Sequence, residues 1–286
     1  MNSLYKSEKG KKEILHLYEE KLKSLQINCV PKLIQTSFGA TNILITGDNS
    51  KPPILVIHGS NGCAPISLET YPNLHNKFQV FAIDVLAQPN KSAGTPMSMK
   101  DNSYGIWIQE IIKTLQLKNV TLVGFSFGGL IILKTLIENE NNIKEVFLAA
   151  PAFIVNGNPL KLLFKVFIPM KRFMKTKKSK FLEIFLNTLF TKPDTFAFEF
   201  LSKVMVHFTM DFTPVPVIKE KEAQAIKTPI TIFAAKKDLI FPGLKMIKRA
   251  KKIFPSIPKV ILLENSKHVQ SKSDNLEIEK VILDTV

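Results

Sequence analysis

The sequence predicts an α/β protein with an open, mostly parallel β-sheet, helices on both faces and one long helical insertion. Short apolar segments rich in β-branched residues alternate with segments of helical periodicity along most of the 286 residues. Several of the apolar segments lack a two-residue alternation with polar residues, as is typical of parallel strands covered on both faces. Between residues 152 and 227 only helical patterns occur. The alternation therefore predicts the sheet, and its interruption predicts the insertion.

Seven segments are expected to form strands. They are TNILITG from Thr41, PPILVIHG from Pro52, FQVFAID from Phe78, NVTLVG from Asn119, KEVFLAAP from Lys144, TPITIFAAKKD from Thr228 and KVILLEN from Lys259.

Helices are expected between these strands. In MKDNSYGIWIQEIIKTLQL, apolar residues recur at helical spacing, and Asp101, Asn102 or Ser103 can cap the N-terminus. GGLIILKTLIENENN continues directly from one strand, and GLKMIKRAKKIF follows another. We divide the chain into an N-terminal helical segment (1–28), a core (29–151 and 228–286) and a helical cap (152–227). Pro169 and Pro193 are expected to end or kink helices of the cap.

Composition narrows the class of protein. Hydrophobic residues at 45% and charged residues at 22% are typical of a folded domain, which excludes disordered and collagen-like chains. Cys29 and Cys63 form no Cys-x-x-Cys pair, so neither a zinc site nor a disulfide framework is indicated. The charged N-terminus does not have the pattern of a secretory signal, and we expect a cytoplasmic protein. The net charge of +15 comes mostly from dispersed lysines without a nucleic-acid-binding motif, so we expect no nucleic-acid partner.

Ser126 is the candidate nucleophile. It lies in Gly124-Phe125-Ser126-Phe127-Gly128, between an apolar strand and an apolar helix. Such a Gly-x-Ser-x-Gly turn is so tight that its flanking positions must be small, and it leaves the serine hydroxyl exposed above the sheet. The alternative is a structural serine in a glycine-rich turn.

A serine nucleophile needs a base, and the base needs a carboxylate to orient it. Of the five histidines, only His268 lies in a loop just beyond a late predicted strand, and Asp238 occupies the corresponding loop after the preceding strand. Ligand sites of open α/β sheets lie beyond the carboxyl ends of the strands. The order Ser126, Asp238, His268 therefore predicts a catalytic triad. His58 and Asp84 are expected to organise loops instead.

An acyl-transfer site also needs two donors for the oxyanion. We expect one to be the backbone N–H of Phe127, which follows the nucleophile. The second is expected in HGSNGC, from the N–H of Ser60, with Asn61 as the second choice.

These segments together resemble a known family. PPILVIHGSNG, FAIDVLAQPNKSAG, LVGFSFGGL, FAAKKDLIFP and NSKHVQ are similar to the corresponding motifs of α/β-hydrolases, in their lid-bearing serine esterase and lipase-like branch. The resemblance covers nearly the whole chain and implies a serine triad, with no metal and no organic cofactor. One loop departs from the common glycine-rich form, because Ala87, Pro89 and Asn90 occupy positions where glycine or small residues are frequent.

The expected reaction is hydrolysis of a small-molecule carboxylic ester through an acyl-enzyme. Aromatic residues of the cap are expected to line a pocket for an apolar short-to-medium acyl or alcohol group: Phe164, Phe167, Phe173, Phe181, Phe185, Phe196 and Phe200. A carbon–carbon bond hydrolase, an amidase, a lactonase or a non-catalytic binding protein of the same fold remain alternatives.

Residues 160–180 contain seven lysines, one arginine and no acid among large apolar residues. A cationic amphipathic helix can associate weakly with an anionic membrane surface. The alternative is a cap helix whose lysines simply face water. The sequence leaves the oligomeric state open, and the N-terminal helix either packs on the domain or mediates a dimer.

Overall fold

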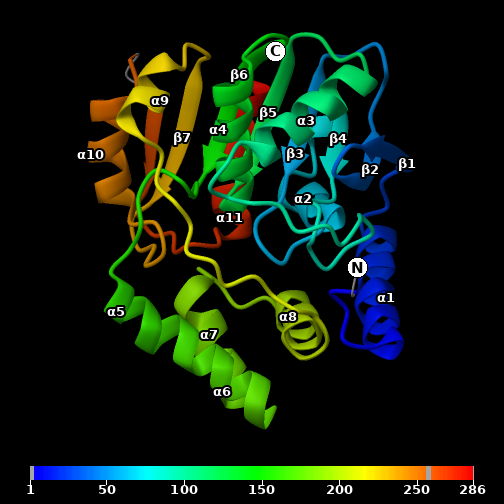
Figure 1. Ribbon diagram of the computed structural model, residues 1–286, viewed down its shortest axis with the longest axis vertical. Helices are drawn as coiled ribbons and strands as arrows, with labels where there is room; N and C mark the ends of the chain where they lie inside the picture. The colour runs from blue at the N-terminus through cyan, green and yellow to red at the C-terminus, as the bar shows by residue number, and fades with distance from the viewer. Residues whose placement is uncertain (1–2, 256–258, 286) are drawn as a thin grey trace.

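A computed structural model describes residues 3–255 and 259–285 of the chain. In this part of the chain a single eight-stranded sheet forms the centre of the molecule, in the order β1-β2-β4-β3-β5-β6-β7-β8 (Figure 1). β2 pairs antiparallel with β1 and β4, and the other neighbours are parallel. The strands are β1 (Val30–Thr36), β2 (Gly39–Thr46), β3 (Pro53–Ile57), β4 (Gln79–Ile83), β5 (Val120–Phe125), β6 (Ile143–Ala149), β7 (Ile230–Ala235) and β8 (Lys259–Leu263).

Helices connect the strands and form the cap. They are α1 (Glu8–Ser24), α2 (Ala64–Thr70), the 3-10 helix η1 (Leu74–Asn76), α3 (Ser103–Thr114), α4 (Phe127–Glu138), α5 (Pro159–Leu162), the π-helix η2 (Leu163–Phe167), α6 (Ile168–Thr176), α7 (Ser179–Leu189), α8 (Thr195–His207), α9 (Glu220–Ala225), α10 (Gly243–Ile253) and α11 (Lys272–Leu283).

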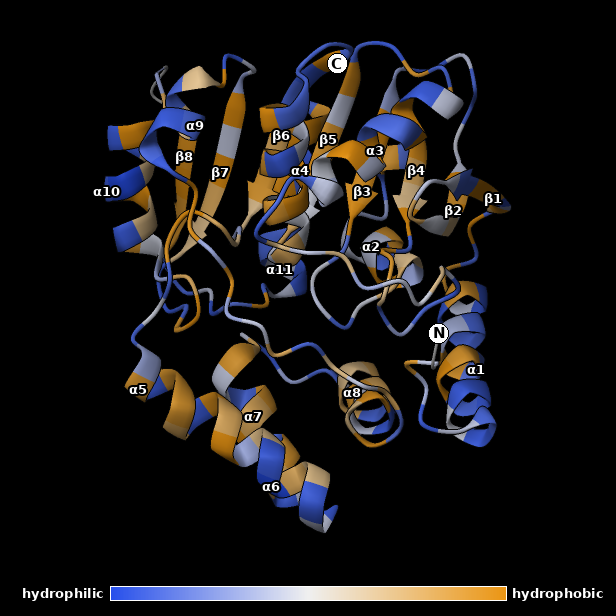
Figure 2. Ribbon diagram, in the orientation of Figure 1, coloured by the Kyte–Doolittle hydropathy of each residue, from blue (hydrophilic) through white to orange (hydrophobic). Residues whose placement is uncertain are grey.

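The two faces of the sheet bury separate apolar clusters. Leu55 and Ile57 of β3 pack in one cluster with residues of α3, α4 and α10, whereas Ile54 and Val56 pack in the other with residues of α1, α2 and α11. Successive side chains of a strand point to opposite faces, so a strand covered on both sides is apolar at every position. The strands are accordingly apolar along most of their length in Figure 2. The mostly parallel sheet expected from the sequence is confirmed.

The first strand was not among the expected ones. β1 is an edge strand, and its Val30 and Leu33 are exposed to solvent. Exposed edge strands lack the apolar run that reveals a buried strand. The seven expected strands correspond to β2 through β8.

The N-terminal helix packs on its own chain. The side chain of Ser7 accepts a hydrogen bond from the N–H of Gly10 and so caps α1. Ile14, Leu17 and Tyr18 are buried in the cluster that includes residues of α2 and α8. Of the two roles considered for this helix, the structure shows packing on the domain.

The segment from residue 152 to residue 227 contains α5 through α9, and α5 to α8 lie beyond one end of the sheet (Figure 1). α6, α7 and α8 share an apolar cluster that includes Met170, Phe185 and Met205. Pro169 is the second residue of α6, just beyond the end of η2, where the helical hydrogen-bond pattern changes, and Pro193 lies in the connection between α7 and α8. No helix within residues 3–255 and 259–285 is long and apolar enough to cross a membrane.

Candidate active site

Ser126 occupies a strained turn between β5 and α4. Its backbone has φ 52° and ψ −111°, a conformation that side-chain-bearing residues rarely adopt. The turn also packs closely on its neighbours. A Cβ atom at Gly128 would lie 2.3 Å from the carbonyl oxygen of Ile57, and one at Gly124 would lie 2.7 Å from the carbonyl oxygen of Gly128. The two flanking glycines are therefore required by the close approach of backbone to backbone.

The structure brings Ser126, Asp238 and His268 together. Nε2 of His268 lies 2.9 Å from Oγ of Ser126, and Nδ1 lies 2.8 Å from Oδ2 of Asp238. All three side chains are buried. A carboxylate can only accept, so the proton of the neutral imidazole is on Nδ1, and the lone pair of Nε2 faces the serine hydroxyl.

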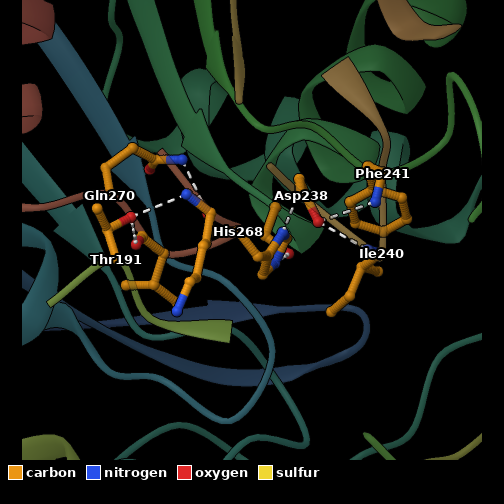
Figure 3. A network of polar contacts seen from close by, with 9 residues as sticks. Thr191, Asp238, Ile240, Phe241, His268 and Gln270 are labelled. Carbon is orange, nitrogen blue, oxygen red and sulfur yellow. Dashed lines mark hydrogen bonds and ion pairs between the residues drawn. The ribbon is translucent and has the colours of Figure 1, made fainter. Parts of the chain in front are cut away.

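Asp238 is held in place by the chain that follows it. Its Oδ1 accepts hydrogen bonds from the backbone N–H groups of Ile240 at 2.7 Å and Phe241 at 3.1 Å (Figure 3). One carboxylate oxygen is therefore anchored while the other faces the imidazole. Two other acids near His268 have different partners: Glu264 pairs with Lys236 at 2.6 Å, and Asp274 accepts the N–H of Ser271 in the capping box of α11.

The loop that carries His268 is tied to the cap. Oγ1 of Thr191 accepts a hydrogen bond from the N–H of Lys267 and donates one to the carbonyl of Val269, so its two bonds flank His268. Nε2 of Gln270 donates to the carbonyl of His268 itself (Figure 3). Thr191 is far from His268 in the sequence, and no sequence pattern singled it out.

Two aromatic rings enclose the imidazole. The ring of Phe125 lies 5.2 Å from that of His268, and the ring of Phe241 lies 5.5 Å from it, centroid to centroid. Phe125 lies beside His268 because the last residue of β5 points toward the loop at Gly59.

The expected oxyanion donors lie around the serine. A Cβ atom at Gly59 would lie 3.3 Å from Cβ of Ser126, so the loop after β3 passes beside the nucleophile. Within the described residues, the N–H groups of Phe127 and Ser60 have no hydrogen-bond acceptor. The N–H of Asn61, the second choice, donates to Oε1 of Gln88 at 2.6 Å and is not free for an oxyanion. Sequence reasoning missed Gln88, which anchors this loop.

His58 and Asp84 organise the loops behind the site. Nε2 of His58 accepts from the N–H of Val85 at 3.0 Å, and Nδ1 lies 2.7 Å from the carbonyl of Gly59. Burial lowers the pKa of His58 to about 4, so its ring is neutral at physiological pH. Asp84 accepts from the hydroxyl of Tyr18 at 3.0 Å, and burial raises its pKa to about 6.

Cys63 and Trp107 are buried in the core. Cys63 is fully buried, and burial raises the pKa of its thiol well above the usual value. Trp107 is buried with its Nε1 donating to Oγ1 of Thr41 at 2.9 Å. Within the described residues, no group of three or more His, Cys, Asp and Glu side chains has the arrangement of a metal site.

A cavity of about 870 Å³ opens above Ser126, between the core and the cap. Of the aromatic residues expected to line it, Phe167, Phe185, Phe196 and Phe200 do so. The other three point elsewhere, because a helix presents only part of its circumference to a cavity. Phe164 faces solvent, Phe173 is buried within the cap, and the ring of Phe181 lies beneath the guanidinium of Arg172.

The chain is similar to one known protein family and to a bacterial carboxylesterase. The family described as the alpha/beta hydrolase fold matches residues 52–205. An uncharacterized carboxylesterase of Bacillus subtilis, nap, is 23% identical over 273 residues, which cover 89% of this chain and 85% of the relative.

Two solved structures have the same overall fold. The naproxen esterase (carboxylesterase NP) of Bacillus subtilis superposes with a TM-score of 0.84 at 19% identity, covering 98% of this chain and 99% of its own. A 2-hydroxy-6-oxo-6-phenylhexa-2,4-dienoate hydrolase of Rhodococcus superposes with a TM-score of 0.65 at 16% identity, covering 91% of this chain and 97% of its own.

Proposed function

The chain belongs to the α/β-hydrolase fold family, and on that premise we propose that it hydrolyses carboxylic esters through an acyl-enzyme formed on Ser126. The observation that carries the proposal is the hydrogen-bonded series Ser126 Oγ, His268 Nε2, His268 Nδ1 and Asp238 Oδ2. A relative and several structural neighbours that bear the name carboxylesterase or esterase support the ester as substrate.

In the first half-reaction, Oγ of Ser126 attacks the carbonyl carbon of the ester while its proton passes to Nε2 of His268. Asp238 stabilises the imidazolium that results. The tetrahedral intermediate then collapses, its bond to the alcohol oxygen breaks, and the alcohol takes the proton from Nε2. In the second half-reaction, water attacks the acyl-enzyme and gives its proton to Nε2. Collapse releases the carboxylic acid and returns the proton to Ser126.

The negative charge of each tetrahedral intermediate needs donors that are already in place. We assign this role to the backbone N–H groups of Phe127 and Ser60. Phe127 is the first residue of α4, so its N–H has no acceptor within the helix and lies at the positive end of the helix dipole. Loss of one such donor typically lowers kcat by on the order of a hundredfold.

The cavity supports an apolar group on the substrate. Its volume of about 870 Å³ lies toward the upper end of ligand sites, and aromatic and aliphatic side chains of the cap form much of its wall. We therefore extend the expected group from short-to-medium chains to bulky apolar acyl groups. Similarity to a naproxen esterase agrees with an ester of a bulky aromatic acid.

Labelling with a fluorophosphonate tests the nucleophile. The wild-type protein should label at Ser126, and the Ser126→Ala variant should not. Failure of the wild-type protein to label, or equal labelling of the variant, would exclude a serine hydrolase.

A panel of p-nitrophenyl esters of increasing acyl size, beside amides and vinylogous diketones, tests the reaction. Faster turnover of esters with large apolar acyl groups is expected. Preferential cleavage of the diketones would instead favour a carbon–carbon bond hydrolase, the activity in the name of the Rhodococcus neighbour. Labelling without turnover of any substrate would favour a binding protein.

A further inference from the structure

The outward side of the cap carries a continuous apolar stripe. Leu160, Leu163, Phe164 and Phe167, in the helical run from α5 through η2, are 65%, 44%, 64% and 37% exposed. Their spacing of i, i+3, i+4 and i+7 places them on one side of the helix. The opposite side of this run and of α6, which continues it, is already buried, since Val166, Met170 and Phe173 belong to the apolar cluster of the cap. Packing within the chain therefore does not account for the stripe.

The run that carries this stripe and the residues that follow it as far as α7 bear positive charges without ion-pair partners. The eight cationic side chains between residues 160 and 180 are all exposed: Lys161, Lys165, Lys171, Arg172, Lys175, Lys177, Lys178 and Lys180. None of them forms an ion pair with a described residue, although lysines elsewhere, such as Lys21 and Lys236, pair with glutamates. The charge of Lys177 also adds to burial in lowering the pKa of the Lys6 ammonium. These side chains are therefore available to anions from outside the chain.

We propose that this face of the cap docks on an anionic lipid bilayer. The stripe inserts Leu163 and Phe164 among the acyl chains near the headgroups, while the surrounding lysines contact lipid phosphates. A second copy of the chain fits this face less well, because two such surfaces would bring like charges together. An anionic polymer would satisfy the lysines but leave the apolar stripe in water.

The stripe also adjoins the cavity above Ser126. Phe167 belongs to the stripe and lines the cavity, and its neighbours Leu162 and Val166 line the cavity as well. In Figure 1 the run from α5 to α6 lies at the end of the molecule away from the sheet. A docked bilayer therefore contacts the same helix that walls the cavity. If the proposed ester hydrolysis holds, an apolar ester can pass from the bilayer along this helix to Ser126.

Sedimentation with lipid vesicles tests the docking separately from catalysis. The Ser126→Ala protein, which cannot hydrolyse lipid, is mixed with vesicles of phosphatidylcholine alone or with phosphatidylglycerol. We expect binding only to the phosphatidylglycerol vesicles, and weaker binding at high salt. Added to this protein, Leu163→Ser with Phe164→Ser should lower the partition coefficient at least about tenfold, as should Lys165→Gln, Lys171→Gln and Lys175→Gln together.

A matched control comes from α10, another basic helix with an exposed leucine. Leu244→Ser with Lys245→Gln and Lys248→Gln removes similar groups from a face outside the cap and should leave binding unchanged. With Ser126 restored, the Leu163→Ser, Phe164→Ser variant should still hydrolyse a soluble ester, since neither residue lines the cavity. This activity also shows that the variant is folded.

Three results would overturn the docking proposal. The first is negligible binding to phosphatidylglycerol vesicles, and the second is equal binding to both kinds of vesicle. The third is dimerisation in sedimentation equilibrium that the stripe substitutions abolish, since the stripe would then be covered by a second copy. Absence of ester hydrolysis with intact vesicle binding would contradict the proposed function and leave the docking supported.

Discussion

Nδ1 of His268 lies 2.8 Å from Oδ2 of Asp238, whose other oxygen is anchored by two backbone N–H groups. An asparagine at position 238 can keep the anchored oxygen and would then present its NH₂ group to Nδ1. The imidazole would have to carry its proton on Nε2, where it cannot accept the proton of Ser126. We expect Asp238→Asn to lower kcat by on the order of 10⁴ with little change in melting temperature. Steady-state kinetics measures kcat, and thermal unfolding measures the melting temperature. A loss of kcat below tenfold would contradict the role of Asp238 in the triad.

The hydroxyl of Thr191 links the cap to the loop of His268 through two hydrogen bonds, and the backbone N–H of Thr191 adds a third to the carbonyl of Val269. Thr191→Val has a similar shape but leaves the N–H of Lys267 without its acceptor, and the carbonyl of Val269 keeps only the bond from the backbone N–H of residue 191. We expect kcat to fall about tenfold or more as the imidazole becomes less well positioned, with a smaller change in KM. Thr188→Val is the control, because Oγ1 of Thr188 only donates to the carbonyl of Ile184 within α7. Similar kinetics of the two variants would argue against a positioning role.

Oε1 of Gln88 accepts a hydrogen bond from the N–H of Asn61 and so anchors the loop that carries Ser60. Gln88→Ala should lower kcat about tenfold, because the expected oxyanion donor of Ser60 becomes less well placed. Gln88→Glu retains an acceptor for this N–H and should recover most of the rate. Equal activity of Gln88→Ala and the wild-type protein on a soluble ester would show that the loop keeps its position without this bond.

Gly128 and Gly94 differ in the space available for the methyl group that an alanine would add. At Gly128 a Cβ atom would lie 2.3 Å from the carbonyl oxygen of Ile57, whereas at Gly94 the nearest atoms belong to Leu4, at 3.7 Å. We expect Gly128→Ala to lower the free energy of unfolding by about 3 kcal/mol, because backbone must move to accommodate the methyl group. Gly94→Ala should change it by less than about 0.5 kcal/mol. Urea denaturation of both variants measures the difference.

Asp84 should make stability depend on pH. Burial raises its pKa to about 6 in the folded protein, from 3.8 as the ordinary value. Between these pH values the folded state binds more protons than the unfolded state, so the contribution of Asp84 to stability falls as pH rises. Relative to Asp84→Asn, the wild-type protein should therefore gain up to about 3 kcal/mol as pH falls from 7 to 4.

The shifted pKa of His58 changes the pH dependence of stability in the opposite direction over much of the same pH range. Its pKa is lowered to about 4, so the unfolded state binds more protons and this contribution rises with pH. The wild-type protein and Asp84→Asn both contain His58, so the effect of His58 largely cancels in the difference between their free energies of unfolding. Urea denaturation at a series of pH values measures this difference. A difference that is constant from pH 4 to 7 would show that the carboxyl of Asp84 titrates normally.

The chain order of motifs was enough to predict which residues gather at the site. Parallel strands place the loops after their carboxyl ends at one edge of the sheet, so Ser126 after β5, Asp238 after β7 and His268 after β8 could be expected to meet. The sheet itself could be predicted for a similar reason, since buried parallel strands are apolar throughout. β1 could not, because an exposed edge strand carries no such pattern.

Contacts between distant segments were decided only by the tertiary structure. No sequence pattern predicted that Thr191 of the cap would form hydrogen bonds on both sides of His268. Nor did one predict that Gln88 would accept a hydrogen bond from the N–H of Asn61, whereas the N–H of Ser60 has no acceptor among the described residues. The composition of the cap predicted an apolar, cationic surface, but not that Phe164 faces water while Phe185 faces the cavity. Periodicity defines the faces of a helix, and only packing against the rest of the chain determines what each face contacts.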